Sequence, residues 1–245
     1  MTRVYLTGGL RLDGPEASFT DVDLPGNQGR LAFAALLVHR RALERDTLAE
    51  IVWDGALPPK WDGALSTIVS KIRSLLGRVG LDAKAMMPTI GGAYAMVLPS
   101  DAWVDVEDAA RRLDLAEGAV RHGDVCTATA QGTAASAVLR RPFLPGVDGE
   151  WVETRRRSQT DARYRCAVVL ARAWIERGDP GLAVTIIEDA INLDPIREVG
   201  HQLLIGAELA RGDRGAAQRA YERCRDVLDR ELGVGPSPTT RSLVS

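Results

Sequence analysis

The chain is poor in the residue types that most enzyme active sites and metal centres use. Its 245 residues include three cysteines and three histidines, and aromatic residues make up 5%. These cysteines and histidines are Cys126, Cys166, Cys224, His39, His122 and His201. The spacing of the cysteines excludes a Cys-x-x-Cys pair, so we expect small core residues, and no histidine has neighbours at metal-ligand spacing. The sequence therefore predicts no metal site and no cofactor.

Motifs that bind nucleotides or carry nucleophilic catalysis are also missing. The pairs Gly8-Gly9 and Gly91-Gly92 lack the Lys-Ser/Thr of a phosphate-binding loop and the strand-to-helix context of a dinucleotide fingerprint. Neither a Gly-x-Ser-x-Gly elbow nor the protein kinase motifs occur. We therefore expect a protein that is not an enzyme, and hairpin turns at the two glycine pairs.

Long apolar runs and a strong charge of one sign are absent as well. No stretch approaches about 18 uninterrupted apolar residues, so the sequence predicts no membrane span and no signal peptide, and a cytoplasmic location is expected. The formal net charge is -2, which argues against a protein that coats nucleic acid through its overall charge. Any surface that binds nucleic acid must be local.

The first 98 residues follow the pattern of a winged helix-turn-helix. The expected elements are three short antiparallel strands within residues 1–25, helices over 28–41, 47–54 and 62–78, and a strand hairpin over 87–98. Asp46 stands where the N-cap of the second helix belongs, and Pro58-Pro59 follow that helix. The fold class is therefore mainly α with a small β part, and residues 1–98 form the predicted DNA-binding domain.

The helix over 62–78 is the predicted recognition helix. Its apolar residues recur at helical spacing on one face, and the segment around it carries net +3, from five basic and two acidic residues. Alone, such a helix is more often an ordinary amphipathic surface helix, but a preceding helix and a following hairpin favour a reader of the major groove. The predicted recognition residues are Thr67, Ser70, Lys71, Arg73 and Ser74, with Arg30, Lys60, Arg78 and Tyr94 as weaker candidates for backbone contacts.

Residues 99–245 are predicted to be entirely helical. The breaks Gly178-Asp179 and Gly212-Asp213 lie 34 residues apart, and Leu170, Ala173 and Ala183 recur as Leu204, Ala207 and Ala217 at this offset. This period is that of the tetratricopeptide repeat, of which we predict two copies and a poor third copy around Gly123. Such arrays bind partners on a concave surface, so a protein partner on this domain is a natural second function. The run Arg155-Arg156-Arg157 is expected to be a solvated face.

Several segments together resemble the Streptomyces antibiotic regulatory protein family over nearly the whole chain. They are residues 45–53, Pro58-Pro59, residues 64–77, Val104-Asp105-Val106 and the ending Glu231-Leu232-Gly233-Val234-Gly235-Pro236-Ser237-Pro238. The resemblance implies an OmpR-like winged helix joined to a bacterial transcriptional activator domain of tetratricopeptide type. It also implies an activator that binds direct repeats in double-stranded DNA, usually as a head-to-tail pair of protomers, and contacts RNA polymerase.

The resemblance further assigns a role to the loop between the second and third helices. In such proteins this loop meets polymerase, and here it corresponds to Gly55, Leu57, Pro58, Pro59, Lys60 and Trp61. The protein would then act by recruiting polymerase to a promoter.

The chain departs from the family where basic residues are common. Relatives often carry basic residues at the positions of Ser70 and Ser74, and the hairpin has Ile90 and Ala95 where an arginine is frequent. Because the affinity of these modules depends on phosphate contacts, a second hypothesis stays open. In it, the protein is an interaction scaffold or regulator whose winged helix has weak or lost DNA binding.

Overall fold

The computed structural model describes residues 1–244 and divides the chain into two compact units. Unit 1 comprises Met1–Asp108 and Arg141–Ser158, and unit 2 comprises Ala109–Arg140 and the chain from Gln159 onward. This division differs from the expected boundary between residues 98 and 99. The difference arises because residues 99–108 and a later segment pack with the N-terminal residues.

A four-stranded sheet in the order β3-β2-β1-β6 forms one layer of unit 1. Its strands are β1 (Arg3–Tyr5), β2 (Arg11–Asp13), β3 (Ser18–Thr20) and β6 (Trp103–Val104). The three predicted antiparallel strands are confirmed, and their central residues Val4, Leu12 and Phe19 are in register and buried. Strand β6 pairs in parallel with β1 and was not expected, because a two-residue strand leaves almost no periodic signal in the sequence.

The helices and the hairpin of unit 1 follow the predicted order. They are α1 (Gly26–His39), α2 (Arg45–Trp53), α3 (Trp61–Arg78), α4 (Ala83–Met86), β4 (Thr89–Ile90) and β5 (Ala93–Tyr94). The predicted N-cap of α2 is wrong, since the helix begins at Arg45, one residue before Asp46, and Asp46 lies in its first turn. The short helix α4 was not predicted, and Asp82 caps it by accepting from the backbone N–H groups of Lys84 and Ala85.

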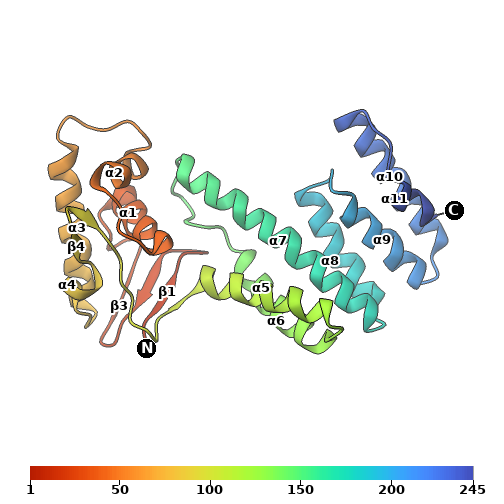
Figure 1. Cartoon of the computed structure of the whole chain (residues 1–245), viewed down its shortest axis with the longest axis horizontal. Helices are drawn as coiled ribbons and strands as arrows, with labels where there is room; N and C mark the ends of the chain where they lie inside the picture. The colour runs from red at the N-terminus through yellow and green to blue at the C-terminus, as the bar shows by residue number, and fades with distance from the viewer. Residues whose placement is uncertain (245) are drawn as a thin grey trace. The chain divides into compact units, whose positions relative to one another are not determined.

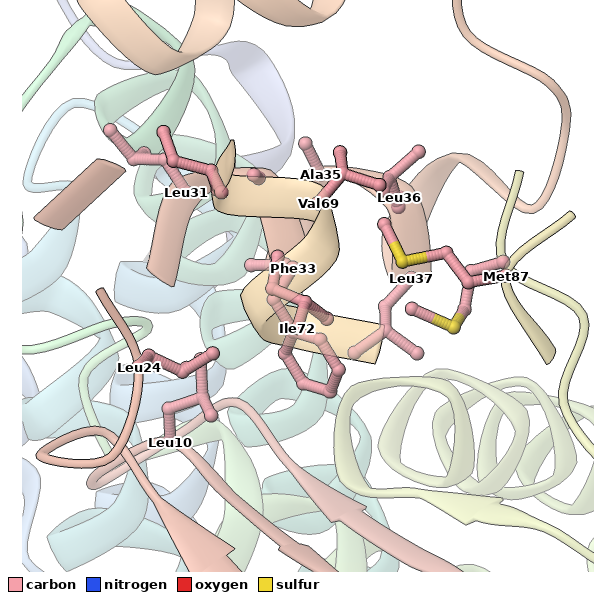
Figure 2. Packing of buried hydrophobic residues seen from close by; sticks show 14 of the residues in the cluster. Leu10, Leu24, Leu31, Phe33, Ala35, Leu36, Leu37, Val69, Ile72 and Met87 are labelled. Atoms are coloured by element: carbon pink, nitrogen blue, oxygen red, sulfur yellow. The ribbon is translucent and has the colours of Figure 1, made fainter. Parts of the chain in front are cut away.

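One apolar cluster holds the parts of unit 1 together. Figure 2 shows Phe33 of α1 beside Ile72 of α3, with Leu10 and Leu24 on the side of the sheet. Phe33 and Ile72 are fully buried. The predicted apolar stripe of α3 is therefore confirmed as the face that packs on α1.

Two segments distant in the sequence complete unit 1. The buried carboxylate of Asp105 accepts hydrogen bonds from the backbone N–H of Leu6 and from both the N–H and the hydroxyl of Thr7. Arg156 donates to the carbonyl oxygens of Phe143, Leu144 and Val147 at 2.9 to 3.1 Å. The expectation that the whole arginine run is a solvated face is therefore wrong for Arg156, because its guanidinium satisfies backbone acceptors that no strand or helix pairs.

Unit 2 contains helical pairs that repeat along the chain. The helices that contribute to it are α5 (Asp105–Arg121), α6 (Val125–Leu139), α7 (Glu150–Glu176), α8 (Pro180–Leu193), α9 (Glu198–Ala210), α10 (Arg214–Leu232) and α11 (Pro238–Ser242). The expected period is present, since α8 and α10 begin 34 residues apart, and α7 and α9 end 34 residues apart. Successive helices from α7 to α10 follow one another in Figure 1, and α9 contacts both α8 and α10.

Small residues at the repeat positions allow the helices of unit 2 to approach closely. Ala173, Ala183, Ala207 and Ala217 are all buried, and Gly178 and Gly212 end their helices with φ of +87° and +80°. Gly123 before α6 adopts the same left-handed conformation with φ of +71°. The segment predicted as a poor third copy therefore forms a helix pair with the same type of turn.

The three cysteines differ in their burial. Cys166 and Cys224 are buried, and burial raises the pKa of each thiol to about 11. Cys126 is exposed, so the expectation of a core residue is wrong for it.

Among the helices of residues 1–244, none combines the length and the apolar character needed to cross a membrane.

Candidate nucleic-acid interface

The outward face of α3 carries four of the five predicted recognition residues. Thr67, Ser70, Lys71 and Ser74 are all exposed on it. The hydroxyl of Thr67 donates to the carbonyl oxygen of Gly63 at 2.9 Å, one turn earlier in the helix. Ser70, Lys71 and Ser74 follow Thr67 by three, four and seven residues, so they share one face of the helix. The structure therefore brings these four side chains together on one polar surface.

The fifth predicted residue, Arg73, has a different position. It is half-buried, and its Nε and one terminal nitrogen donate to the carbonyl oxygen of Met87 at 3.0 and 2.7 Å. The same terminal nitrogen donates to the hydroxyl of Thr89 at 2.9 Å. Thr89 is the first residue of β4, so Arg73 ties the hairpin to α3. Its guanidinium is already used within unit 1.

Tyr94 is also enclosed. It is 4% exposed, with the guanidinium of Arg45 at 5.1 Å and that of Arg73 at 5.8 Å from its ring centroid. Arg45 also donates to its hydroxyl. At these distances both arginines make cation–π contacts with the ring. A buried ring whose hydroxyl already has a donor is poorly placed to bind a phosphate.

Arg45 is a site residue that sequence reasoning did not single out. Its Nε donates to the Asp62 carboxylate at 2.8 Å, and a terminal nitrogen donates to the Ser66 hydroxyl at 2.8 Å. Partial burial acts to lower the pKa of Arg45, but the hydrogen bond and the charge of Asp62, with the contribution of Tyr94, raise it. Arg45 therefore links α2 to the start of α3 as a permanent cation. The sequence gives no specific signal for this link, because an arginine followed at some distance by an acidic residue is a common pattern.

The weaker candidates are spread over unit 1. Arg30 on α1 donates to the carbonyl oxygen of Asp21 at 3.2 Å, and Arg78 at the end of α3 lies 3.6 Å from the Asp23 carboxylate. Lys60 is exposed immediately before the first residue of α3. Within the described residues, Lys60 and Lys71 are the cations of the predicted set that have neither an ion pair nor a hydrogen bond.

Two left-handed residues connect the end of α2 to the predicted polymerase-contact loop. Asp54 has φ of +50° and Gly55 has φ of +76°, which turn the chain sharply after α2. Leu57 and Trp61 pack partly against the core of unit 1, and Pro59 and Lys60 are exposed. The loop therefore has an anchored apolar side and an exposed tip.

The residue that precedes the loop has one further attachment within unit 1. The carboxylate of Asp54 accepts a hydrogen bond of 2.9 Å from the backbone N–H of Glu150, the first residue of α7. This N–H is one of the first four of a helix, which have no partner inside the helix, and an anion at a helix N-terminus is favourable. Across residues 1–244, no group of three or more His, Cys, Asp or Glu is placed to hold a metal ion.

Comparison with protein families identifies the larger part of the chain. The model described as the bacterial transcriptional activator domain matches residues 104–245, which is more than half of the sequence. The chain belongs to the bacterial transcriptional activator domain family. This match confirms the activator-domain part of the resemblance, and it begins at Val104, the first residue of one of the segments that carry the resemblance.

Curated relatives of this family member are similar over most of its length. It is 24% identical to the transcriptional regulatory protein MoaR1 of Mycobacterium tuberculosis over 91% of this chain and 73% of that protein. It is 26% identical to the transcriptional regulatory protein EmbR of the same organism over 87% of this chain and 55% of that protein. For the regulatory protein AfsR of Streptomyces coelicolor the identity is 27%, over 88% of this chain and 21% of that protein.

A solved structure has the same fold. The structure of Mycobacterium tuberculosis EmbR in complex with a low-affinity phosphopeptide superposes with a TM-score of 0.89, at 24% identity, over 99% of this chain and 64% of that chain. The chain thus spans less than two thirds of the EmbR chain. The likeness shows that both units have the EmbR fold. The polar face of α3 lies outside the residues that the family model matches.

Proposed function

We propose that the protein is a cytoplasmic, sequence-specific DNA-binding transcriptional activator whose unit 1 is an OmpR-like winged helix-turn-helix. The observation that carries this proposal is the exposed face of α3, where Thr67, Ser70, Lys71 and Ser74 lie together next to a hairpin that Arg73 holds in place. In this arrangement α3 enters the major groove and the hairpin is the wing.

The chemistry of the face suits a reader of base edges. Three short hydroxyl side chains let the helix backbone come close to the bases, where each hydroxyl can donate or accept a hydrogen bond. Lys71 contributes a cation that can reach guanine or a phosphate, and Lys60 contributes one near the N-terminus of α3. The protein acts by binding, without catalysis.

Activation would follow from recruitment. Bound to direct repeats as a head-to-tail pair of protomers, the protein would offer the loop from Gly55 to Trp61 to RNA polymerase and raise its effective concentration at the promoter. Two observations support this part of the proposal. The exposed tip of the loop is held on an anchored base, and the curated relatives MoaR1, EmbR and AfsR are named as regulatory proteins.

One observation favours the second hypothesis, an interaction scaffold with weak or lost DNA binding. Arg73, Arg30 and Arg78 are engaged inside unit 1, which leaves Lys60 and Lys71 as the cations of the predicted set without an internal partner among the described residues. Each phosphate contact contributes to DNA affinity and to its salt dependence. With two such cations, the electrostatic contribution of this face to DNA affinity is small.

Selection against random duplex DNA separates the two hypotheses. The full chain is used, and anisotropy on the enriched duplex is measured from about 50 to 200 mM salt, the range over which phosphate contacts change affinity strongly. We expect enrichment of a directly repeated motif. Lys71→Ala should weaken binding and make the salt dependence shallower by about one counterion.

A matched control removes the same charge elsewhere in unit 1. Arg11 lies on β2 and is paired with Asp13, so Arg11→Ala should leave affinity and salt dependence unchanged. If no motif is enriched at the lowest salt, DNA reading fails and the scaffold hypothesis replaces it. Equal losses in the two variants would show non-specific attraction.

A further inference from the structure

Unit 2 contains an open groove that the DNA-binding proposal does not use. Its volume is about 680 Å³, and its lining comes from α5, α7 and the start of α9. Four valines, Val120, Val168, Val169 and Val199, form its apolar part. Val199 is 39% exposed, so apolar surface is open to solvent at this site.

The arginines of the groove fall into two classes. Arg165 is paired with Glu117 at 2.8 Å, and Arg197 is paired with Asp161 at 2.8 Å and stacks on the ring of Tyr164. Arg121 and Arg172 also line the groove and are exposed. Among the described residues neither of these two has an ion pair or a hydrogen bond. The groove therefore offers two cations that are not neutralised by the fold.

Two different helices contribute the unpaired arginines, Arg121 from α5 and Arg172 from α7. The two helices are in contact near these arginines, since Ala119 of α5 and Ala173 of α7 belong to one buried cluster. Arg121 comes shortly after Ala119, and Arg172 comes directly before Ala173. Where α7 meets α9, the hydroxyl of Tyr164 accepts a hydrogen bond of 2.9 Å from the backbone N–H of Gly200. The groove thus combines two cations without an ion pair among the described residues, an apolar lining and two ion-paired arginines.

We propose that this groove binds an acidic peptide segment of a partner protein. Carboxylates of the peptide pair with Arg121 and Arg172, and a neighbouring aliphatic or aromatic side chain of the peptide covers the valines. Arginine suits this role because its planar guanidinium forms two parallel hydrogen bonds with a carboxylate. Arginine clusters are a recurrent means of recognising acidic motifs.

The shape of the groove favours a peptide over a small molecule. Sites for small ligands bury most of the ligand surface in a concave pocket, whereas this groove runs across three helices and its arginines and Val199 are exposed. An extended segment can follow such a groove and leave its other side in solvent. The proposal does not depend on DNA binding, because all lining residues belong to unit 2 and the candidate DNA-binding residues belong to unit 1.

Binding of defined peptides to the full chain tests the proposal. The probe is a fluorescein-labelled hexapeptide, Asp-Glu-Leu-Phe-Asp-Glu, measured by anisotropy at low and at physiological salt. Two comparison peptides have either the acids replaced by their amides or the Leu-Phe pair replaced by Ser-Ser. We expect the first peptide to bind, both replacements to weaken binding by on the order of 10-fold or more, and salt to weaken the acidic peptide most.

Variants of the chain locate the binding site. Arg121→Ala and Arg172→Ala should each reduce affinity for the acidic peptide on the order of 10-fold, since each removes one charge-assisted pair. Arg214→Ala removes an exposed arginine at the start of α10, outside the groove, and should have no effect. Circular dichroism and thermal unfolding confirm that the variants are folded, which we expect because all three side chains are exposed.

Three results would overturn the proposal. The first is the absence of binding at about 1 mM peptide, the weak end of specific recognition. The second is an equal loss in Arg214→Ala, which would show attraction without a site. The third is binding of octanoate, a small apolar carboxylate, under conditions where the peptide does not bind. Since DNA affinity of the groove variants should equal that of the unchanged chain, a failure here is distinct from a failure of the DNA-binding proposal.

Discussion

The two units bury apolar surface in different ways. In unit 1, 33 buried residues form one cluster, and four of these residues are alanines. In unit 2, the largest cluster has 11 buried residues, and six of them are alanines. Unit 1 is therefore stabilised mainly by large side chains from a sheet and three helices that meet at one centre, whereas unit 2 depends on close approach between neighbouring helices. The consequence is that unit 1 is sensitive to loss of volume, and unit 2 is sensitive to added volume.

The largest effect is expected from loss of volume in unit 1. Phe33 is fully buried in α1 and makes an edge-to-face contact with Phe19, with ring centroids 5.4 Å apart. Phe33→Ala should reduce the free energy of unfolding by about 3–5 kcal/mol, because it removes buried surface and leaves a cavity. Urea unfolding of the full chain measures this change. A loss below 1 kcal/mol would mean that the core of unit 1 is not packed as described.

Added volume in unit 2 should have the next largest effect. A Cβ atom added at Gly132 of α6 would lie 2.8 Å from Cδ2 of the buried Leu170. Gly132→Ala should therefore destabilise the protein by about 1–3 kcal/mol, despite the higher helix propensity of alanine.

Gly206 of α9 provides the matched control, because a Cβ there meets nothing among the described atoms within 4 Å. Gly206→Ala should stabilise the protein by about 0.5–1 kcal/mol, since alanine loses less backbone entropy than glycine in a helix. Thermal unfolding of the two variants gives the comparison directly. If both shift the midpoint in the same direction, close helix approach is not what limits packing at Gly132.

A smaller effect is expected where an arginine is used structurally. Arg73→Lys keeps the charge but cannot reproduce the hydrogen bonds to both Met87 and Thr89, so we expect a loss of about 1–2 kcal/mol in the free energy of unfolding. Faster amide hydrogen exchange in β4 and β5 should accompany it. Lys71→Ala, two residues earlier and exposed, should leave stability unchanged while it weakens DNA binding. Equal free energies of unfolding for Arg73→Lys and Lys71→Ala would contradict the structural role of Arg73.

The smallest effect is a pH dependence in unit 2. Burial alone would raise the pKa of Glu198, but hydrogen bonds from Thr240 and Ser237, with the charge of His201, lower it below 4.5. A depressed carboxyl pKa contributes stability above the unfolded value of about 4.5, and this contribution is lost as the pH falls through the folded value. The difference in midpoint between the unchanged chain and Glu198→Gln should therefore be largest near neutral pH and shrink below pH 4.5. A difference that is constant with pH would contradict this.

The sequence was informative wherever a residue pattern repeated over several turns. The apolar stripe of α3, the hairpin around Gly91-Gly92 and the helices from α7 to α10 were all predicted, because amphipathic periodicity and glycine turns are local properties of the chain. Glycine and proline mark the end of α2, but the predicted N-cap at Asp46 is wrong, because the helix already begins at Arg45. Capping by a side chain depends on where the preceding residues are held, and that is a tertiary property.

The candidate site was predicted in part. The hydroxyl residues and Lys71 lie on one exposed face as expected, because residues three and four apart on a helix share a face. Arg73 and Tyr94 were expected at the same surface, but they are enclosed by contacts with Met87 and with Arg45. The position of a residue in a helix predicts the face on which its side chain lies, but it does not indicate which distant segment packs over that side chain.

The sequence by itself determined the order of the long helices, the 34-residue repeat and the polar face of α3, because each leaves a periodic pattern of residue types along the chain. Tertiary structure alone decided how individual arginines are used: Arg73 fixes the hairpin and Arg156 binds three carbonyl oxygens, while Arg121 and Arg172 remain exposed in the groove. The physical reason is that all four have the same long, permanently charged side chain, and the partner within its reach depends on which distant segments of the chain pack beside it.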